Sequence, residues 1–339
     1  MTRWLLLRLL WALVTLFGIT VVTFVVLDRA PVDRAELEAE ARAQNGALTD
    51  LASRDAAILR LRVNYGLVDP TTLAPLPVWR RYANWLDNAL ALRFAGPGED
   101  PAAFWRRLGR ALPVTLLLGS LALLVAFGLG VPLGAWAGTR AGSRGDRLLS
   151  HGTFVLAGVP EFLLATLLLL AFGGAWLQWL PSSGLHSRDA AAWPWWQRQL
   201  DLAWHLVLPV AVLATGPLVM VARFVRDAVA RAAAAPFAAN LAALGLEPAV
   251  VRRRLLRNGL APVATLVGVL LPVLVGGSVL VERVFALDGL GQLAFAAVQQ
   301  QDQAMVMAIV VLMAVVTLLA MVLSDLLHAV FDPRVRLAR

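Results

Sequence analysis

The chain has 339 residues, of which 59% are hydrophobic, and its mean hydropathy of +0.72 excludes an ordinary soluble domain. The formal net charge is +8, and all 30 basic residues are arginine, so a Walker A phosphate loop and a Schiff-base lysine are both excluded. The chain also lacks cysteine, which excludes disulfides and thiolate metal sites. The positive charge does not indicate nucleic-acid binding, because membrane proteins concentrate cations in their cytoplasmic loops.

Six stretches are long and apolar enough to cross a hydrocarbon core of about 30 Å. The first, about Leu9–Leu27, follows Arg3 and Arg8. A positively charged start before an apolar run is also typical of a secretory signal peptide, which is the alternative interpretation. The run is long for a signal peptide and no small-residue cleavage site follows it, so we expect an uncleaved membrane helix. The other five stretches cover about 113–138, 148–177, 206–225, 260–281 and 304–328.

Residues 28–110 are a long polar segment with twelve arginines and eleven acidic residues. Within it, a predicted helix places Trp79, Tyr82, Leu86 and Leu90 on one face. This helix either lies at the bilayer surface or packs within a small domain of its own. The predicted organisation is a cytoplasmic N-terminus with the first membrane helix (1–27), an extracytoplasmic segment (28–110) and a five-helix core (111–339).

Arginine counts predict the orientation of the chain in the membrane. Fifteen arginines lie in the N-terminus, the 139–147 loop, residues 223–258 and the C-terminal tail, which all fall on one side of the predicted spans. The short loops on the other side hold Arg188, Arg198 and Arg283 at most. Because positive residues accumulate in cytoplasmic loops, we expect both termini and residues 226–259 to be cytoplasmic.

Residues 226–259 have the pattern of a helical hairpin. The stretch Ala232–Leu244 is almost entirely small or apolar and predicts a helix that packs closely. Gly245 favours a turn, and Pro248 suits the first turn of a second helix. That second helix carries four arginines, at positions 252, 253, 254 and 257. The segment is either a docking element for another subunit or a basic loop that only fixes topology.

Seven stretches of the chain together resemble a known family. They are ALPVTLLLGSLALL (111–124), GVPEFLLATLLLLAF (158–172), WLPSSG (179–184), HLVLPVAVL (205–213), LRNGLAPVATLVG (256–268), GGSVLVERVFALDGLG (276–291) and DLLHAVFDPRVR (325–336). The similarity is to permeases of bacterial ABC importers, in the dipeptide, oligopeptide and nickel branch. Within that branch, the long first loop, FALDGLG and DPRVR look most like the microcin C-type oligopeptide permeases.

The resemblance implies an all-α, polytopic membrane protein of about six helices with the type I ABC importer permease fold. It implies a subunit that is not an enzyme and holds no cofactor, catalytic residue or metal, because ATP is bound by partner subunits. The expected partners are a second permease, cytoplasmic ATPases, an extracytoplasmic solute-binding protein and membrane lipid, and the expected cargo is oligopeptides, with dipeptides, nickel or other solutes as alternatives.

The resemblance also assigns the 226–259 hairpin to coupling with the ATPases. Residues 239–250 would contain the coupling helix, seated in a groove of one ATPase. Leu241 and Arg254 depart from the residues usual in the family. The residues expected at this contact are Ala239, Leu241, Gly245, Leu246, Glu247, Arg254, Arg257 and Asn258.

Five further residues are candidates for the wall of a translocation path. Glu161 and Glu282 lie in or near predicted spans, where a charge is costly, so each either faces the path or pairs with polar groups at a helix end or interface. Gly276, Gly277 and Ser278 permit close helix approach and suit either a pore lining or simple packing.

The remaining ionisable residues do not indicate a reaction or ion coupling. Asp325 and His328, one turn apart, suit a proton relay or, more simply, an interface pair. His151, His186 and His205 have no metal-ligand spacing. An ion-coupled secondary transporter would need an intramembrane relay and inverted repeats, and a membrane enzyme would need clustered ionisable residues. Neither pattern is found.

Overall fold

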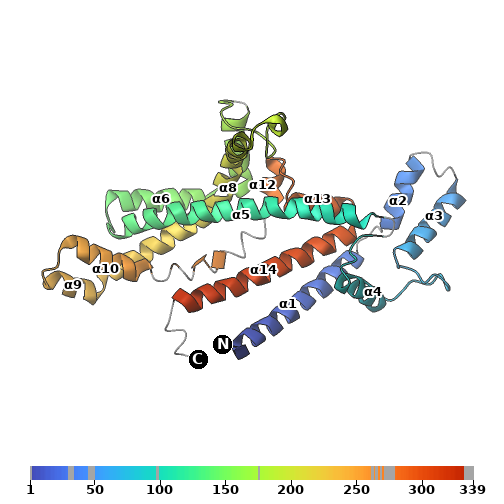
Figure 1. The fold of residues 1–339 in the computed structure, drawn as a ribbon, viewed down its shortest axis with the longest axis horizontal. Helices are drawn as coiled ribbons and strands as arrows, with labels where there is room; N and C mark the ends of the chain where they lie inside the picture. The colour runs from blue at the N-terminus through green and yellow to red at the C-terminus, as the bar shows by residue number, and fades with distance from the viewer. Residues whose placement is uncertain are drawn as a thin grey trace. The chain divides into compact units, whose positions relative to one another are not determined.

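The computed structural model describes residues 2–29, 34–44, 50–96, 99–174, 176–260, 263, 266–267, 269–270 and 279–331 (Figure 1). In this part of the chain, regular structure is helical, and extended pairing is limited to one bridge between Val68 and Pro75. The predicted all-α class is confirmed. The chain divides into two compact units, Met1–Ala111 with Leu293–Val315 and Leu112–Gln292 with Val316–Arg339, and each is described by itself.

The first unit contains the polar segment that follows the first apolar helix. Its helices are α1 (Thr2–Asp28), α2 (Arg34–Gln44), α3 (Leu51–Asn64), α4 (Val78–Leu90), the first turns of α5 (Pro101–Gly138), most of α13 (Leu290–Gln299) and the first half of α14 (Gln303–Phe331). The second unit holds the rest of α5, α6 (Arg144–Gly158), α7 (Glu161–Leu168), α8 (Trp195–Ala234), α9 (Pro236–Ala243), α10 (Pro248–Leu260) and α12 (Val279–Val284).

Four helices of the described part are long and apolar enough to span a membrane: α1 over Leu7–Asp28, α5, α8, and α14 over Gln303–Ser324. They correspond to the predicted first, second, fourth and sixth spans. The fifth predicted span, about 260–281, falls largely outside the described residues. The helices α5 and α8 have 38 and 40 residues, about 57 and 60 Å at 1.5 Å per residue, so each extends well beyond a core of about 30 Å.

The third predicted span is not one straight helix. The helices α6 and α7 together are apolar enough to cross, but they are bent by 99° at Val159 and Pro160. Proline has no N–H for the helix ladder, and it disfavours helical geometry in the preceding residue. Val159 accordingly has extended dihedral angles (φ −86°, ψ 119°). A single π-helical turn, Leu169–Gly173, continues α7.

Glycines on α5 allow it to pack closely against α8. Gly130, Gly134 and Gly138 follow one another at four-residue spacing, which places them on one face of the helix. A Cβ at Gly134 would overlap the carbonyl oxygen of Ala222, and a Cβ at Gly138 would lie 2.8 Å from the Val229 Cβ. Small residues at this spacing are typical of tightly packed membrane helices.

The predicted helix over Ala232–Leu244 is wrong at one point, because the chain leaves helical geometry at Ala235. There α8 ends and α9 begins at Pro236. Ala235 has ψ 149°, the extended geometry that a following proline imposes. The small residues therefore belong to the end of one long helix and to a separate two-turn helix.

In the first unit, α2 packs on α3 and α4 packs on α1. The α2–α3 contact buries Ala35, Ala39 and Leu61. Asp50 caps the N-terminus of α3 by accepting a hydrogen bond from the Ser53 N–H at 3.0 Å.

The predicted amphipathic helix is α4, and it lies beside α1. Tyr82 packs edge-on against Phe24 at 5.4 Å between ring centroids and shares a 2.9 Å hydrogen bond with the Thr20 hydroxyl. Arg81 forms a salt bridge of 2.5 Å with Asp28. Trp79, predicted on the same face as Tyr82, is 70% exposed. The α1 contact therefore uses only part of the predicted apolar face.

Candidate functional site: the α9–α10 hairpin and the α5–α8 cavity

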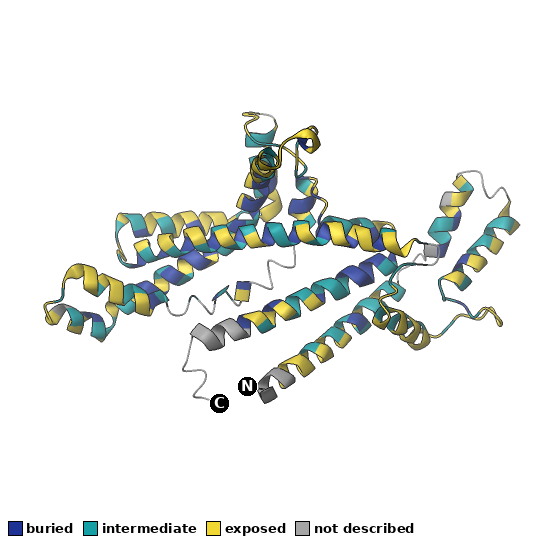
Figure 2. Cartoon of the chain, viewed as in Figure 1, coloured by how far each residue is buried: buried dark blue, intermediate teal, exposed yellow. Residues whose placement is uncertain are grey.

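The hairpin formed by α9 and α10, Pro236–Leu260, is mostly exposed at its turn (Figure 2). Gly245 has φ +68°, a left-handed geometry that side chains with a Cβ resist, and α10 begins at Pro248. The predicted turn residue and helix start are thus in the predicted places. The segment 239–250, predicted to contain the coupling helix, comprises the end of α9, the turn and the first residues of α10.

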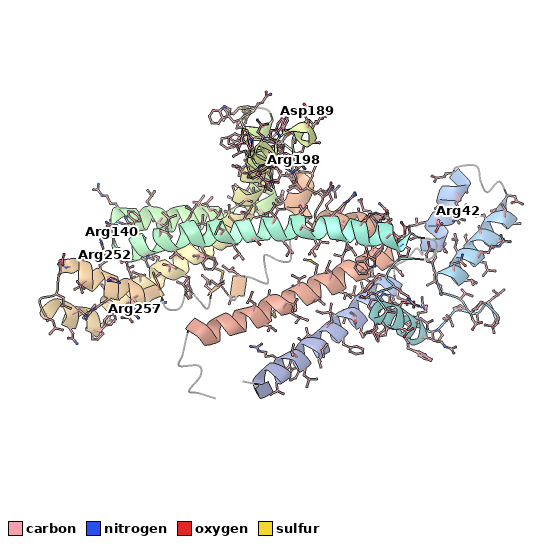
Figure 3. All side chains as sticks on the ribbon, viewed as in Figure 1. Arg42, Arg140, Asp189, Arg198, Arg252 and Arg257 are labelled. Atoms are coloured by element: carbon pink, nitrogen blue, oxygen red, sulfur yellow. The ribbon has the colours of Figure 1, made fainter. Side chains whose placement is uncertain are left out.

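All the residues predicted to make the coupling contact belong to this hairpin. Arg252 and Arg257 project from α10 in Figure 3. Among the expected contact residues, Leu241 and Leu246 are partly buried, and those exposed to solvent are Ala239, Gly245, Glu247, Arg254, Arg257 and Asn258.

The base of the hairpin, in contrast, is tightly packed on α8. Gly259 is buried, and a Cβ there would lie 2.9 Å from the Val229 Cα. Leu256 and Leu260 pack against the cluster that contains Val225 and Val229. Val229 is thereby held between Gly138 of α5 and Gly259 of α10.

A bidentate salt bridge adds to this base. Arg226 of α8 donates from Nε and Nη2 to the two carboxylate oxygens of Asp146, at 2.8 and 2.6 Å. The Gly142 N–H, in the loop between α5 and α6, donates to the same carboxylate at 2.8 Å. Asp146 lies in the polar first turn of α6, outside the apolar stretch, and the hydrogen bonds from Arg226 lower its pKa to about 2. The loop is therefore tied to the part of α8 that leads into the hairpin.

A second constellation joins two of the sequence stretches that carry the family resemblance. Thr115 of α5 donates to Glu282 Oε1 at 2.8 Å, and the Gln292 N–H donates to Glu282 Oε2 at 2.9 Å. The Leu290 N–H in turn donates to the Thr115 hydroxyl at 2.8 Å. A Cβ at Gly289 would overlap the Glu282 carboxylate. The ALPVT stretch and the two ends of the ERVFALDGLG stretch thus meet at one fully buried carboxylate.

The WLPSSG stretch reaches the same place from the loop after α7. The Gly184 N–H donates to the carbonyl oxygen of Phe285 at 2.9 Å. Phe285 and Leu287 are buried in the cluster that also contains Leu118 and Ala165. The turn after α12 is therefore fixed both by its own hydrogen bonds and by this loop.

Beside this network lies a cavity of about 460 Å³ whose walls come from α5, α6, α7, α8 and α12. Both acidic residues named from the sequence, Glu161 and Glu282, line it. Glu282 has no exposed surface, whereas Glu161, at the start of α7, is exposed. The other path candidates, Gly276, Gly277 and Ser278, lie outside the described residues.

Two of the described histidines approach one carboxylate. His186 and His205 both approach Asp201, with their Nδ1 atoms 3.1 and 3.3 Å from its carboxylate oxygens, and Ser187 donates to it from both N–H and hydroxyl. Within the described ranges, no group of three metal-ligating side chains occurs. The side chains of Asp325 and His328 lie outside what the structure describes.

Several residues of these sites were not anticipated from the sequence. Thr115, Asp146 and Arg226 act through partners 80 to 167 positions away, and no local pattern marks such pairs. The four-residue spacing of Gly130, Gly134 and Gly138 was a readable signal for close helix packing.

Comparison with known proteins supplies the family. The model of the family described as "binding-protein-dependent transport system inner membrane component" matches residues 130–337, more than half of the chain. The chain belongs to this family. It is therefore a multi-pass membrane component of a transport system that works with a separate binding protein, and not an enzyme.

Three relatives that cover 77% to 99% of the chain are permeases. The oligopeptide transport system permease protein AppB of Bacillus subtilis is 28% identical over 337 residues, 99% of each chain. The dipeptide permease DppB of Bacillus subtilis is 28% identical over 330 residues, 96% of each chain. The oligopeptide permease OppB of Mycobacterium tuberculosis is 32% identical over 271 residues, 77% of this chain and 82% of the relative. The predicted peptide-permease branch is confirmed, and the narrower similarity to microcin C-type permeases stays a prediction.

Proposed function

We propose that the chain is the permease subunit of an ATP-driven importer of peptides, in which the α9–α10 hairpin docks on a separate ATPase subunit. A second permease subunit would complete the path, and both termini would be cytoplasmic. The peptide cargo is taken from the names of relatives, which are oligopeptide and dipeptide permeases.

The observation that carries the proposal is the contrast within the hairpin. Its turn presents Gly245 and Glu247 to solvent, and Arg254 is exposed on α10, while its base is packed on α8 and braced by the Asp146–Arg226 pair. An exposed tip on a stiff support can transmit a rigid-body displacement, whereas a loop that only fixes topology needs no such support.

The charge distribution within the second unit supports the orientation. Arg140, Arg252 and Arg257 lie toward one end of this unit in Figure 3, away from Asp189 and Arg198. The end that holds the hairpin is the one with most of the arginines of the unit, as expected for a cytoplasmic face.

Crosslinking tests the docking directly, because the chain has no native cysteine. A Glu247→Cys variant carrying a photoactivatable thiol reagent should capture a nucleotide-hydrolysing protein in native membranes. The matched control is Asp189→Cys in the loop before α8, which should not capture it. Capture of no ATPase from Glu247→Cys, with the labelled protein correctly inserted, would contradict the proposal.

Transport assays test the mechanics. Gly245→Val and Leu241→Pro should abolish peptide uptake and leave membrane insertion intact, since one strains the turn and the other breaks α9. Gly66→Val is a matched control, because Gly66 has almost the same φ (+67°) and open space around it but lies in residues 28–110. Normal uptake by the two hairpin variants would count against coupling through this hairpin.

A further inference from the structure

The cavity beside Glu282 has the size and lining of a binding site for a small solute. Its volume of about 460 Å³ lies within the range of about 300–1,000 Å³ that is usual for ligand pockets. Its walls are mainly apolar, with Leu118, Val212 and Leu280 among them, and its side-chain polar groups come from two threonines and two glutamates. A pocket of this kind holds an apolar body and orients it with a few polar contacts.

The bend between α6 and α7 opens into this cavity. Val159 and Glu161, on either side of Pro160, both line it. From Leu148, where the apolar stretch of α6 begins, to Val159 the chain rises about 16 Å, so the bend falls inside a hydrocarbon core of about 30 Å. Backbone that leaves helical geometry at membrane depth is tolerated where it is buried in protein or lines a hydrated cavity. The bend therefore has a physical reason to face this space.

The two acidic residues of the cavity are in different situations. The Glu282 carboxylate is fully buried and accepts hydrogen bonds from Thr115 and from the Gln292 N–H, so it holds the turn after α12 in place. Glu161 is exposed and lies in the first turn of α7, where the helix dipole favours a negative charge. Glu161 is thus the carboxylate placed to meet a solute.

We propose that Glu161 binds the protonated amino terminus of a peptide as it passes through this cavity, an inference that rests on the proposed peptide transport. A peptide α-amino group has a pKa of about 8 and is mostly charged at pH 7. Thr215 of α8, which also lines the cavity, donates its hydroxyl proton to the Ala211 carbonyl at 2.8 Å, so its oxygen remains an acceptor for a polar group of the solute. The apolar walls receive the peptide's side chains.

Charge rescue in the cysteine-free chain tests this assignment. Uptake of a tryptic digest of casein, whose peptides have free amino termini, is measured by mass spectrometry in spheroplasts whose chromosomal gene carries each variant. Glu161→Gln and Glu161→Cys should lower this uptake about tenfold, the scale of a lost hydrogen bond to a charged group. Modifying Glu161→Cys with an anionic sulfonatoethyl thiol reagent should restore uptake, and a cationic trimethylammonium reagent of similar size should not.

The controls separate this assignment from the proposed function. Asp189→Cys, in the exposed loop before α8, should transport normally before and after either reagent. If the unmodified chain gives no more uptake than a deletion strain, peptide transport itself is refuted. If that uptake is normal but Glu161→Gln leaves it unchanged, or if both reagents act alike on Glu161→Cys, the role of Glu161 is refuted while peptide transport stands.

Discussion

The base and the tip of the α9–α10 hairpin differ in almost every physical respect. At the base, Val229 is packed between two glycines, and Asp146, with 3% of its side chain exposed, is held by Arg226. At the tip, Leu244 is 73% exposed and Glu247 faces solvent. Packing of this kind stabilises one arrangement of the helices, whereas an exposed tip contributes little to folding. The base therefore provides stiffness, and the tip is available for a partner.

The largest expected effect comes from breaking the buried pair at the base. Asp146→Ala leaves Arg226 without its buried partner and should cost about 3–5 kcal/mol of unfolding free energy. The matched control is Asp227→Ala, because Asp227 also pairs with Arg226, at 2.9 Å, but has 52% of its side chain exposed. That loss should stay below about 1 kcal/mol. Thermal unfolding of both variants in detergent measures the difference, and equal losses would contradict the buried character of the base.

A smaller effect is expected from crowding the contact between α5 and α8. Gly134→Ala places a methyl group against the Ala222 carbonyl oxygen and should cost about 1–3 kcal/mol. Gly128→Ala, on the same helix with open space around it, should be neutral or stabilising by up to about 1 kcal/mol. If chemical denaturation ranks the two variants in the opposite order, the glycines do not set the helix spacing.

On the exposed face of α10, stability and transport should separate. Arg253→Gln and Arg254→Gln alter exposed side chains and should change stability by less than about 0.5 kcal/mol. Uptake should nevertheless fall several-fold, because the docking surface loses charge. A parallel loss of stability and uptake would mean that these two arginines contribute to the folded core.

The smallest effect is expected between pH 5 and 8, where the stabilisation from the base should not change with pH. The pKa of Asp146 is lowered from its ordinary 3.8 to about 2, so the folded state favours the carboxylate. The resulting stabilisation is fully present above about pH 5 and is lost as the pH falls through 4 toward 2. The stability difference between the wild type and Asp146→Asn should therefore be flat from pH 5 to 8. A difference that changes near pH 6 would contradict the assignment.

Elements specified by local sequence were predicted well. The membrane helices α1 and α14 follow from uninterrupted apolar runs, and the turn at Gly245 and the helix start at Pro248 follow from the backbone geometry of those two residue types. The break at Ala235 and the bend at Val159 were missed although a proline follows each. In both cases a continuous helix was predicted through the proline because the stretch is long and apolar. Whether a proline breaks a helix or only bends it depends on tertiary packing.

The candidate sites were predicted less completely because they depend on contacts between distant segments. Glu282 was predicted as a site residue because a charge within a membrane span is costly. Its hydrogen-bond partner Thr115, however, lies 167 residues earlier in the chain. Glu161 was named as a charge within a span, and the cavity it lines requires the mutual placement of five helices. Apolar periodicity specifies that such helices exist and leaves their pairing open.

The length of α8 has a geometric consequence. Thr215 at the cavity and Val229 at the hairpin base are 14 residues apart on one unbroken helix, a separation of about 21 Å. A tilt of this rod by about 10°, pivoting at Thr215, would move Val229 sideways by about 4 Å at that spacing. Under the proposed function, a displacement of the hairpin base would therefore reach the cavity as a rotation of α8.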